Sequence, residues 1–183
     1  MLEQYLVRHC APTLAGLKTA SLFNCQVTSK EELRRDLVRW NASLRSKGVA
    51  LALIAVRGGR ALIYVYRRNR LLRDWKNPGV QAYLVRHGYS ETDVEANLQF
   101  LAGRIMQEDD FPHEIGLFLG YPFEDVIAFI ENEGKNCKCC GYWKVYCNEW
   151  EAQRQFEKFK KCTHVYCRCF LQGTPITRLT VAA

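Results

Sequence analysis

Cysteines are concentrated near the C-terminal end of this 183-residue chain, where seven of the nine lie between residues 137 and 169. Cys137 and Cys140 have the C-x-x-C spacing that lets two thiolates bind one metal ion from a tight turn. Cys162 and Cys167 form a second pair, beyond a short apolar segment and a helical one. We therefore predict that these four cysteines bind zinc, iron or an iron–sulfur cluster, in metal handling or in a redox response.

Two other roles for these thiols remain open. Free cysteine packs as a small hydrophobe and is among the most buried residue types. Thiols with a lowered pKa can instead be redox-active without binding a metal. The second pair has four intervening residues rather than two, so the pattern is less specific for a metal than a double C-x-x-C would be.

A second candidate site surrounds His113 and Glu114, which precede the apolar segment IGLFLG. The second histidine of an H-E-x-x-H zinc helix is missing, so metalloprotease chemistry is not expected. Glu114 in a first helical turn is favoured by the helix dipole alone. A histidine beside Gly116 and Gly120 could also line a pocket for a small ligand. Small-ligand binding by His113 and Glu114 is therefore an alternative prediction.

Cys10 is a further candidate for ligand contact, because it lies beside His9 and close to the flexible Gly16. A nucleophilic cysteine needs a base near it in space and a lowered pKa. Adjacency in sequence supplies neither, because neighbours on a helix point about 100° apart. We therefore predict no catalytic residue, and we expect a binding protein rather than an enzyme.

Basic side chains are frequent in the segment RRNRLLRDWK, which follows a predicted hairpin. The cations that could contact phosphate groups are Arg67, Arg70, Arg73 and Lys76. Trp75, together with Tyr64 and Tyr66 on an exposed hairpin edge, would add stacking on bases. No known nucleic-acid-binding motif is present. An accessory protein that binds RNA or DNA through residues 67–76 is a further alternative, although a basic run is commonly a solvated helix face.

The pentapeptide YLVRH occurs at residues 5–9 and 83–87, and the second copy continues as the RHG of histidine phosphatases. That chemistry needs a strand before the RHG turn, a second histidine and a proton donor. The second copy instead follows Pro78 and ends at Gly88, which is typical of a helix. We therefore reject the phosphatase interpretation and interpret both copies as helix ends.

The composition, with 48% hydrophobic and 25% charged residues, is that of a globular protein. We expect residues 1–183 to form a single domain, with a cysteine-rich part at residues 134–171. The net charge of +7 favours acidic partners. The N-terminus lacks the apolar core of a signal peptide, and the longest apolar run, residues 49–56, is too short to span a bilayer. We therefore expect a cytoplasmic protein with reduced thiols and no membrane contact.

The clearest local signals lie in the first half of the chain. Ser29 and Glu32 form a capping box, and Gly48 ends the helix that they begin. Two apolar runs then flank Gly58-Gly59, which predicts a β-hairpin with its first arm inside a sheet. A strand near residues 17–25 would precede the helix, and helices are expected from residue 67 onward, with one short strand near residue 144. The predicted fold is α+β, a small mixed sheet of about four strands packed by several helices.

Several long phrases identify a family resemblance. They are HCAPTLAGLKTASLF, GGRALIYVYR, FPHEIGLFLGYPFEDVIAFIENEG, KCCGYWKVY and FKKCTHVYCRC. In these phrases the chain resembles domain-of-unknown-function family 3793, a set of bacterial proteins common in anaerobic Gram-positive bacteria. The resemblance spans nearly the whole chain. It implies no catalytic residues, and it implies only a loose association with iron-responsive gene settings.

Overall fold

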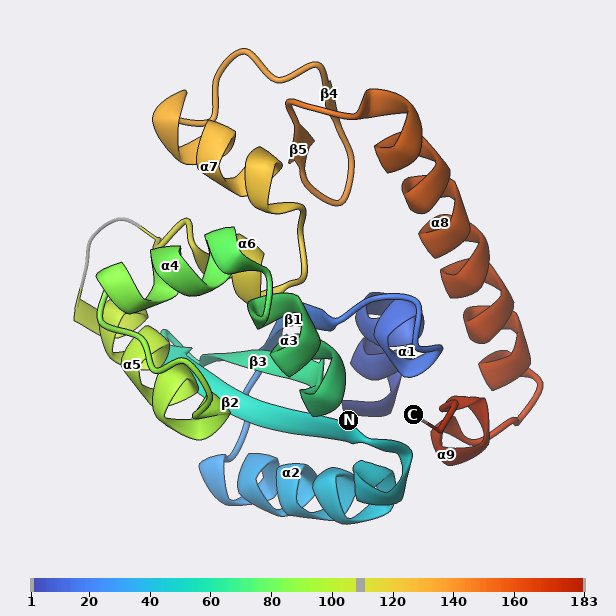
Figure 1. Cartoon of the computed structure of the whole chain (residues 1–183). Coiled ribbons are helices and arrows are strands. Elements are labelled where there is room, and N and C mark those ends of the chain that lie inside the picture. The colour runs from blue at the N-terminus through green and yellow to red at the C-terminus, as the bar shows by residue number, and fades with distance from the viewer. Residues whose placement is uncertain (1, 108–110, 183) are drawn as a thin grey trace.

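A three-stranded antiparallel sheet lies at the centre of the molecule, in the order β1-β3-β2 (Figure 1). The strands are β1 Ala20–Gln26, β2 Val49–Arg57 and β3 Arg60–Arg67. This computed structural model describes residues 2–107 and 111–182. β2 and β3 are joined by the predicted turn at Gly58 and Gly59, both with positive φ. The fold is α+β, as predicted.

The central strand β3 is buried on both faces because its side chains alternate between two apolar cores. The side chains that face the first core are Ala61, Ile63 and Val65. The side chains that face the second core are Leu62, Tyr64 and Tyr66. Tyr64 and Tyr66 are therefore buried, and the prediction that they lie on an exposed edge is wrong.

Helices α1 (Leu2–Leu14) and α2 (Lys30–Leu44) form the first core with one face of the sheet. Ser29 caps α2 by accepting a hydrogen bond from the Glu32 backbone N–H, as the capping box predicted. The short 3-10 helix η1 (Arg45–Lys47) follows, and Gly48 ends it with φ 71°. The first YLVRH copy lies inside α1, which continues through Pro12, so its interpretation as a helix end is wrong.

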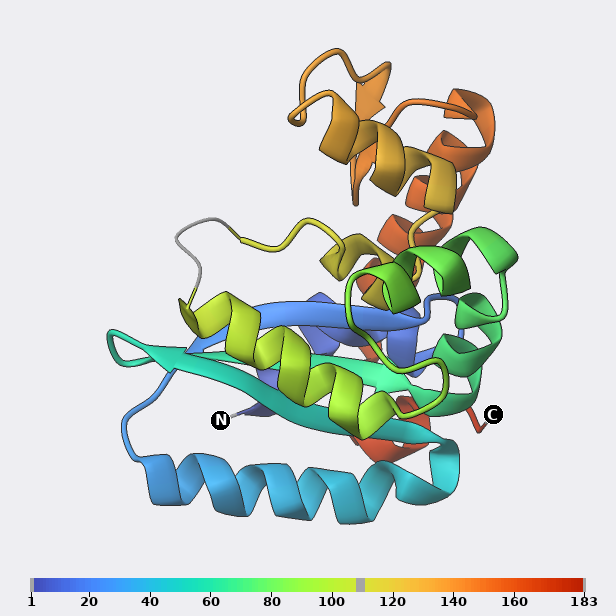
Figure 2. The same cartoon turned by 60° about the vertical axis from the view of Figure 1, so that its left-hand side comes forward.

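Four helices cover the opposite face of the sheet and form the second core (Figure 2). They are α3 Arg68–Trp75, α4 Pro78–Arg86, α5 Val94–Gln107 and α6 Ile115–Phe118. The second YLVRH copy ends α4, where His87 is the C-cap and its Nδ1 lies 2.7 Å from the Tyr83 carbonyl oxygen. Here the predicted helix end is confirmed.

The remaining elements form a lobe beyond the sheet and a long helix that leads from this lobe back to the other helices around the sheet. α7 (Phe123–Glu131) is followed by the small hairpin of β4 (Cys139–Cys140) and β5 (Lys144–Val145), and then by α8 (Glu149–Leu171). We call residues 123–159 the C-terminal lobe and the rest of the described chain the body. α8 begins in this lobe, and its C-terminal half runs back along α1 to the short helix α9 (Ile176–Leu179) (Figure 1).

The sheet differs from the prediction in two respects. The three-stranded sheet is antiparallel throughout rather than mixed, because β1 and β2 both pair with β3. β2 is an edge strand, although its apolar residues predicted an interior one. The physical reason is that α2 and α5 both pack on β2, so an edge strand also has apolar side chains on its two faces. No helix in the described part of the chain has both the length and the apolarity to cross a membrane.

Candidate ligand-binding cleft

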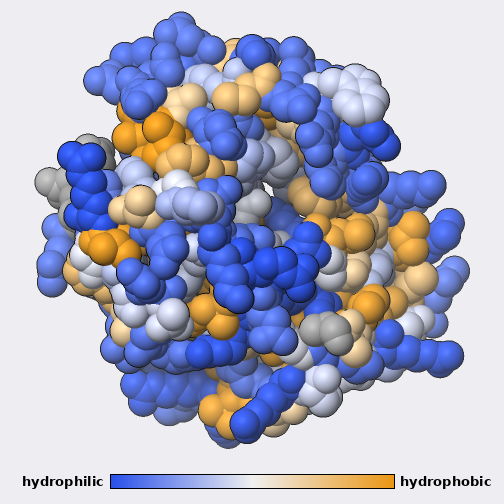
Figure 3. Space-filling view, in the orientation of Figure 1, coloured by the Kyte–Doolittle hydropathy of each residue, from blue (hydrophilic) through white to orange (hydrophobic). Residues whose placement is uncertain are grey.

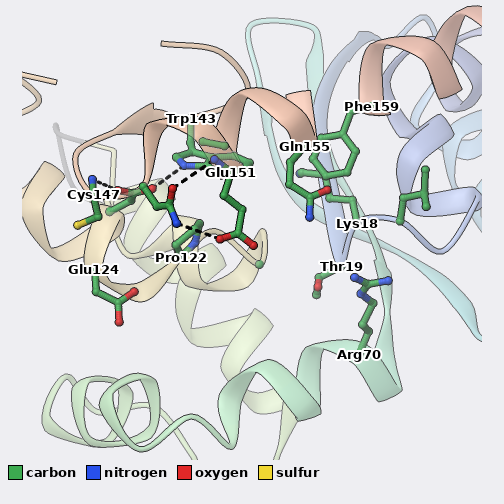
Figure 4. Close-up of a pocket in the computed structure, with 15 residues that line it drawn as sticks. Lys18, Thr19, Arg70, Pro122, Glu124, Trp143, Cys147, Glu151, Gln155 and Phe159 are labelled. Carbon is green, nitrogen blue, oxygen red and sulfur yellow. Dashed lines mark hydrogen bonds between the residues drawn. The ribbon is translucent and has the colours of Figure 1, made fainter. Parts of the chain in front are cut away.

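A cleft of about 550 Å³ lies between the body and the C-terminal lobe. The surface is hollowed between these two parts in the space-filling view (Figure 3). The body contributes the residues between α1 and β1, Arg70 of α3, and Gly120, while α7, the residues that flank β5, and α8 supply the other wall. Lys18, Thr19 and Arg70 lie together on one side, and Glu124 and Cys147 lie across from them (Figure 4). We call this the central cleft.

Lys18 is the most unusual residue of the central cleft because its cationic side chain is buried. Its ammonium donates a hydrogen bond to the Ala20 carbonyl and lies 5.0 Å from the centre of the Tyr121 ring. Among the residues that the structure describes, no carboxylate lies within ion-pair distance of it. Burial lowers the pKa of Lys18 to about 8, a direction opposed by the nearby Cys10. The cleft thus contains an incompletely solvated amine.

The turn between α1 and β1 places Lys18 at this wall. Gly16 adopts φ 73°, and the backbone N–H groups of Leu17 and Lys18 both donate to the Pro12 carbonyl, at 2.8 and 3.0 Å. Arg70 braces the turn because its guanidinium donates to the Gly16 carbonyl. Two cationic side chains are therefore held at one end of the central cleft.

Thr19 lines the central cleft beside Lys18, and its hydroxyl donates a 2.5 Å hydrogen bond to Asp74 Oδ2. Desolvation raises the pKa of Asp74, although this hydrogen bond opposes the change. Gly120 passes close over the pair, with φ 71°, and a Cβ at this position would lie 2.6 Å from Thr19 Oγ1. Glycine is required here because any side chain would displace Thr19.

The opposite wall is acidic and polar. Glu124 is exposed on α7, and Glu151 accepts a 3.1 Å hydrogen bond from the Asn148 side chain at the start of α8. Gln155 and the apolar side chains of Trp143 and Phe159 complete this wall. The central cleft is therefore cationic on the side of the body and anionic on the side of the lobe.

Asp125 fixes the β4–β5 hairpin to α7. Its Oδ1 accepts hydrogen bonds from the backbone N–H groups of Tyr146 and Cys147, at 2.8 and 2.9 Å, and its Oδ2 accepts one from Trp143 Nε1 at 2.8 Å. The carboxylate is buried, and both of its oxygens accept hydrogen bonds from these donors. Asp125 consequently holds the wall of the cleft rather than offering a free charge to a ligand.

His113 lines a second, mostly apolar pocket of about 350 Å³, and small-ligand binding there stays a prediction. The His113 ring lies edge-on to Phe129, with 5.0 Å between ring centres. Trp143 and Asp125 line both this His113 pocket and the central cleft, so the two are neighbours. Glu114 is not at the pocket, because its buried carboxylate pairs with Arg104 and accepts a 2.7 Å hydrogen bond from Tyr89.

Cys10 lies in the first core and is fully buried, so its predicted contact with a ligand is not supported by its position. Burial raises the pKa of its thiol well above the ordinary value. The neutral thiol lies near Lys18 but is no counter-ion for it. Cys10 therefore serves as a core residue.

The structure does not bring the four predicted metal ligands together. Cys137 and Cys140 lie next to and in the β4–β5 hairpin, whereas Cys167 packs at the margin of the first core. With a rise of about 1.5 Å per residue, Cys162 and Cys167 lie about 20 and 27 Å along α8 from Glu149. No group of three or more histidine, cysteine or acidic side chains in residues 2–107 and 111–182 is placed to hold a metal ion. Metal binding by these thiols stays a prediction.

The basic segment 67–76 does not form one surface. Arg67 is buried, and its guanidinium donates to the carbonyls of Thr13, Leu14, Lys47 and Val181. Its predicted phosphate contact is therefore wrong, because every one of these bonds is internal. Arg70 lines the central cleft. Arg73 and Lys76 are exposed.

Sequence reasoning missed Lys18 and Trp143 as site residues. One signal for Lys18 was available. In the alternating segment LKTASLF, Lys18 is in phase with Ala20 and Leu22, so it is a cation on the apolar face of the predicted strand, although β1 begins only at Ala20. No comparable signal pointed to Trp143.

Comparison with known proteins identifies the family alone. No curated protein and no solved structure matches the chain. The model of one family matches residues 6–180, which is nearly the whole chain, in agreement with the resemblance found in the sequence. The chain therefore belongs to the family described as protein of unknown function (DUF3793).

Proposed function

We propose that this protein binds a small organic anion in the central cleft, with the carboxylate or phosphate group of the ligand at Lys18 and Arg70. The observation that carries the proposal is the buried ammonium of Lys18, which has no carboxylate within ion-pair distance in residues 2–107 and 111–182. Its pKa of about 8 instead of 10.5 corresponds to roughly 3 kcal/mol of unfavourable free energy for keeping the charge in place. An anionic ligand would supply the missing counter-charge and recover part of this free energy.

The opposite wall limits the kind of anion. Glu124 and Glu151 would repel a polyanion such as RNA or DNA that fills the cleft. Trp143 and Phe159 favour a ligand with an apolar portion. The matching ligand is a small molecule with one compact anionic group at the body and a neutral or cationic part toward the lobe.

Isothermal titration calorimetry with phosphate, acetate, small carboxylic acids and phosphate monoesters tests the proposal. We expect at least one class to bind, and we expect Lys18→Met and Arg70→Met to weaken its affinity about 10- to 100-fold, because a charged hydrogen bond contributes about 1.5–3 kcal/mol. Arg73→Met is the matched control, since Arg73 is exposed on the same helix as Arg70. The proposal fails if no anion binds, or if the two cleft variants bind as the wild type does.

A further inference from the structure

The amine of Lys18 differs in its environment from the lysines of the outer surface. Lys18 is buried at the wall of the central cleft, whereas Lys158 and Lys161 of α8 are exposed. A lysine in a poorly solvated site without a carboxylate is more readily neutral, and a neutral amine is a nucleophile. The position of Lys18 thus suits covalent chemistry as well as charge recognition.

The groups around this amine come from several elements, and none of them holds it as a permanent cation. Cys10 of α1 faces it as a buried thiol, and Tyr121 presents its ring. Arg70 of α3 adds a second positive charge to the same wall of the cleft. Thr19 lies next to Lys18 in the chain and is hydrogen-bonded to Asp74. Burial among these groups removes water from the amine, and this desolvation favours its uncharged form.

We propose that Lys18 is a carbonyl-reactive amine, which forms an imine with a small oxo acid or aldehyde that also carries an anionic group. This inference rests on the proposed function, because the anionic group must first bind in the central cleft. It makes the substrate class specific: an anion with a ketone or aldehyde carbon close to its charged end, such as a 2-oxo acid. Arg70 would hold the carboxylate while the carbonyl carbon meets Lys18 Nζ.

The step is a condensation and needs no oxidant or reductant. The nitrogen lone pair attacks the carbonyl carbon and the carbonyl oxygen takes up a proton, while the nitrogen loses one. The carbon–oxygen bond then breaks as the nitrogen lone pair forms the carbon–nitrogen double bond, the oxygen leaves as water with a further proton, and the nitrogen releases its second proton. Thr19 lines this wall of the cleft and its hydroxyl is hydrogen-bonded to the Asp74 carboxylate, so this pair is placed to relay the protons of the condensation.

The lowered pKa of Lys18 is in line with this role, which the burial of the amine at the cleft wall indicates. With a value of about 8, close to one tenth of the amine is neutral at about pH 7. An ordinary lysine, with a pKa near 10.4, is neutral to only about 0.04% at the same pH. The supply of nucleophile at Lys18 is therefore a few hundred-fold greater than at a surface lysine.

Reductive trapping tests the inference on the full chain. The protein is incubated with pyruvate or glyoxylate and cyanoborohydride, which reduces an imine to a stable secondary amine, and the labelled lysines are located by peptide mass spectrometry. We expect labelling of Lys18 to exceed that of Lys158 and Lys161 at least about 10-fold, given the larger neutral fraction. Lys18→Met should lose this label, and Lys158→Met should retain it at Lys18.

Calorimetry on the same samples separates this inference from the proposed function. Lys18→Arg keeps a positive charge but cannot form the imine, so we expect it to retain anion binding better than Lys18→Met and to show no trapping at residue 18. If pyruvate binds in the wild type but labels all lysines evenly or leaves Lys18 unlabelled, the imine is overturned while anion binding stands. If no anion binds, both are overturned.

Discussion

The body and the C-terminal lobe are held together by different physical means. In the body, two extended apolar cores lie on the two faces of β3. The lobe has a core of only Val145, Ala152 and Phe156, with a few aromatic neighbours, and its hairpin depends on three hydrogen bonds to Asp125. Apolar burial, which contributes roughly 25 cal/mol per Å², therefore stabilises the body far more than the lobe.

This difference explains where a ligand site is found. The central cleft lies where the large cores end and the polar attachment of the lobe begins, so its walls contain charged side chains that neither core could accept. Substitutions in the body should act on global stability. Substitutions in the lobe should act on local opening, because regions with few buried apolar contacts open at low free energy.

Thiol reactivity should show the largest contrast between the two regions. Cys140 and Cys147 are exposed in the lobe, whereas Cys10 is fully buried in the body and its thiol pKa is raised. We expect native-state labelling with a disulfide reagent to modify Cys140 and Cys147 at least about a thousand-fold faster than Cys10, which must wait for unfolding. Peptide mapping over time measures the rates, and comparable rates for Cys10 would contradict the described core.

The same labelling tests the predicted metal site. Zinc or iron(II) added to anaerobically purified protein would protect Cys137, Cys140, Cys162 and Cys167 together if they share one metal. Protection confined to Cys137 and Cys140 would contradict the four-cysteine site. Burial raises the pKa of Cys162 to about 11, which disfavours the thiolate that a metal requires.

Substitution of Arg67 should have the next largest effect, a loss of global stability, because its guanidinium donates hydrogen bonds to four backbone carbonyls of the body. Arg67→Met leaves the carbonyls of Thr13, Leu14 and Val181 without this donor, and we expect the free energy of unfolding to fall by about 3–5 kcal/mol. Urea denaturation measures it. Arg73→Met, on the exposed side of α3, should stay within about 0.5 kcal/mol of the wild type. An equal change in the free energy of unfolding for the two variants would contradict the internal hydrogen bonds of Arg67.

Local patterns predicted the elements of the body well. The capping box at Ser29 and the Gly58-Gly59 turn specify a helix end and a hairpin through contacts between near neighbours, so the sequence alone revealed them. The error at Arg67 arose because a run of basic residues was interpreted as one surface. The strand period places Arg67 in phase with Val65 and Ile63, which face the first core, and that alternation could have identified it as an inward-facing residue.

The central cleft could not be predicted in the same way. Its walls combine Lys18 with Glu151 and Phe159 of α8. Lys18 lies more than a hundred residues before these two in the chain, and they meet only because α8 folds back toward the body. The cysteine prediction failed to anticipate the same feature. A helix as long as α8 separates the two cysteine pairs in space, whereas the spacing argument assumed that a helix would bring the second pair back to the first.

Lys18→Met should stabilise the protein, because it removes a buried charge at the boundary between the two regions. The folded-state pKa of Lys18 is lower than the unfolded one, so the wild type binds fewer protons when folded and this unfavourable contribution fades as pH rises from about 8 toward 10.5. We expect the variant to be more stable by up to roughly 3 kcal/mol at about pH 7, and this advantage to shrink by roughly 2 kcal/mol at about pH 10. Urea unfolding of both proteins across this range measures the difference. A pH-independent difference would show that Lys18 is neutral or solvated in the folded state.

Asp125→Asn should have the smallest and most local effect. The amide retains a carbonyl oxygen for the N–H groups of Tyr146 and Cys147, but its NH₂ group faces Trp143 Nε1–H, so one hydrogen bond is lost between two donors. We expect a cost of about 2 kcal/mol to the attachment of the lobe. Hydrogen exchange of the amides in residues 139–147 should accelerate, while those of β3 keep their wild-type rates because global unfolding governs them. If β3 amides accelerated equally, the lobe and the body would unfold as one cooperative unit, and the division of the molecule into an apolar body and a polar-bound lobe would be wrong.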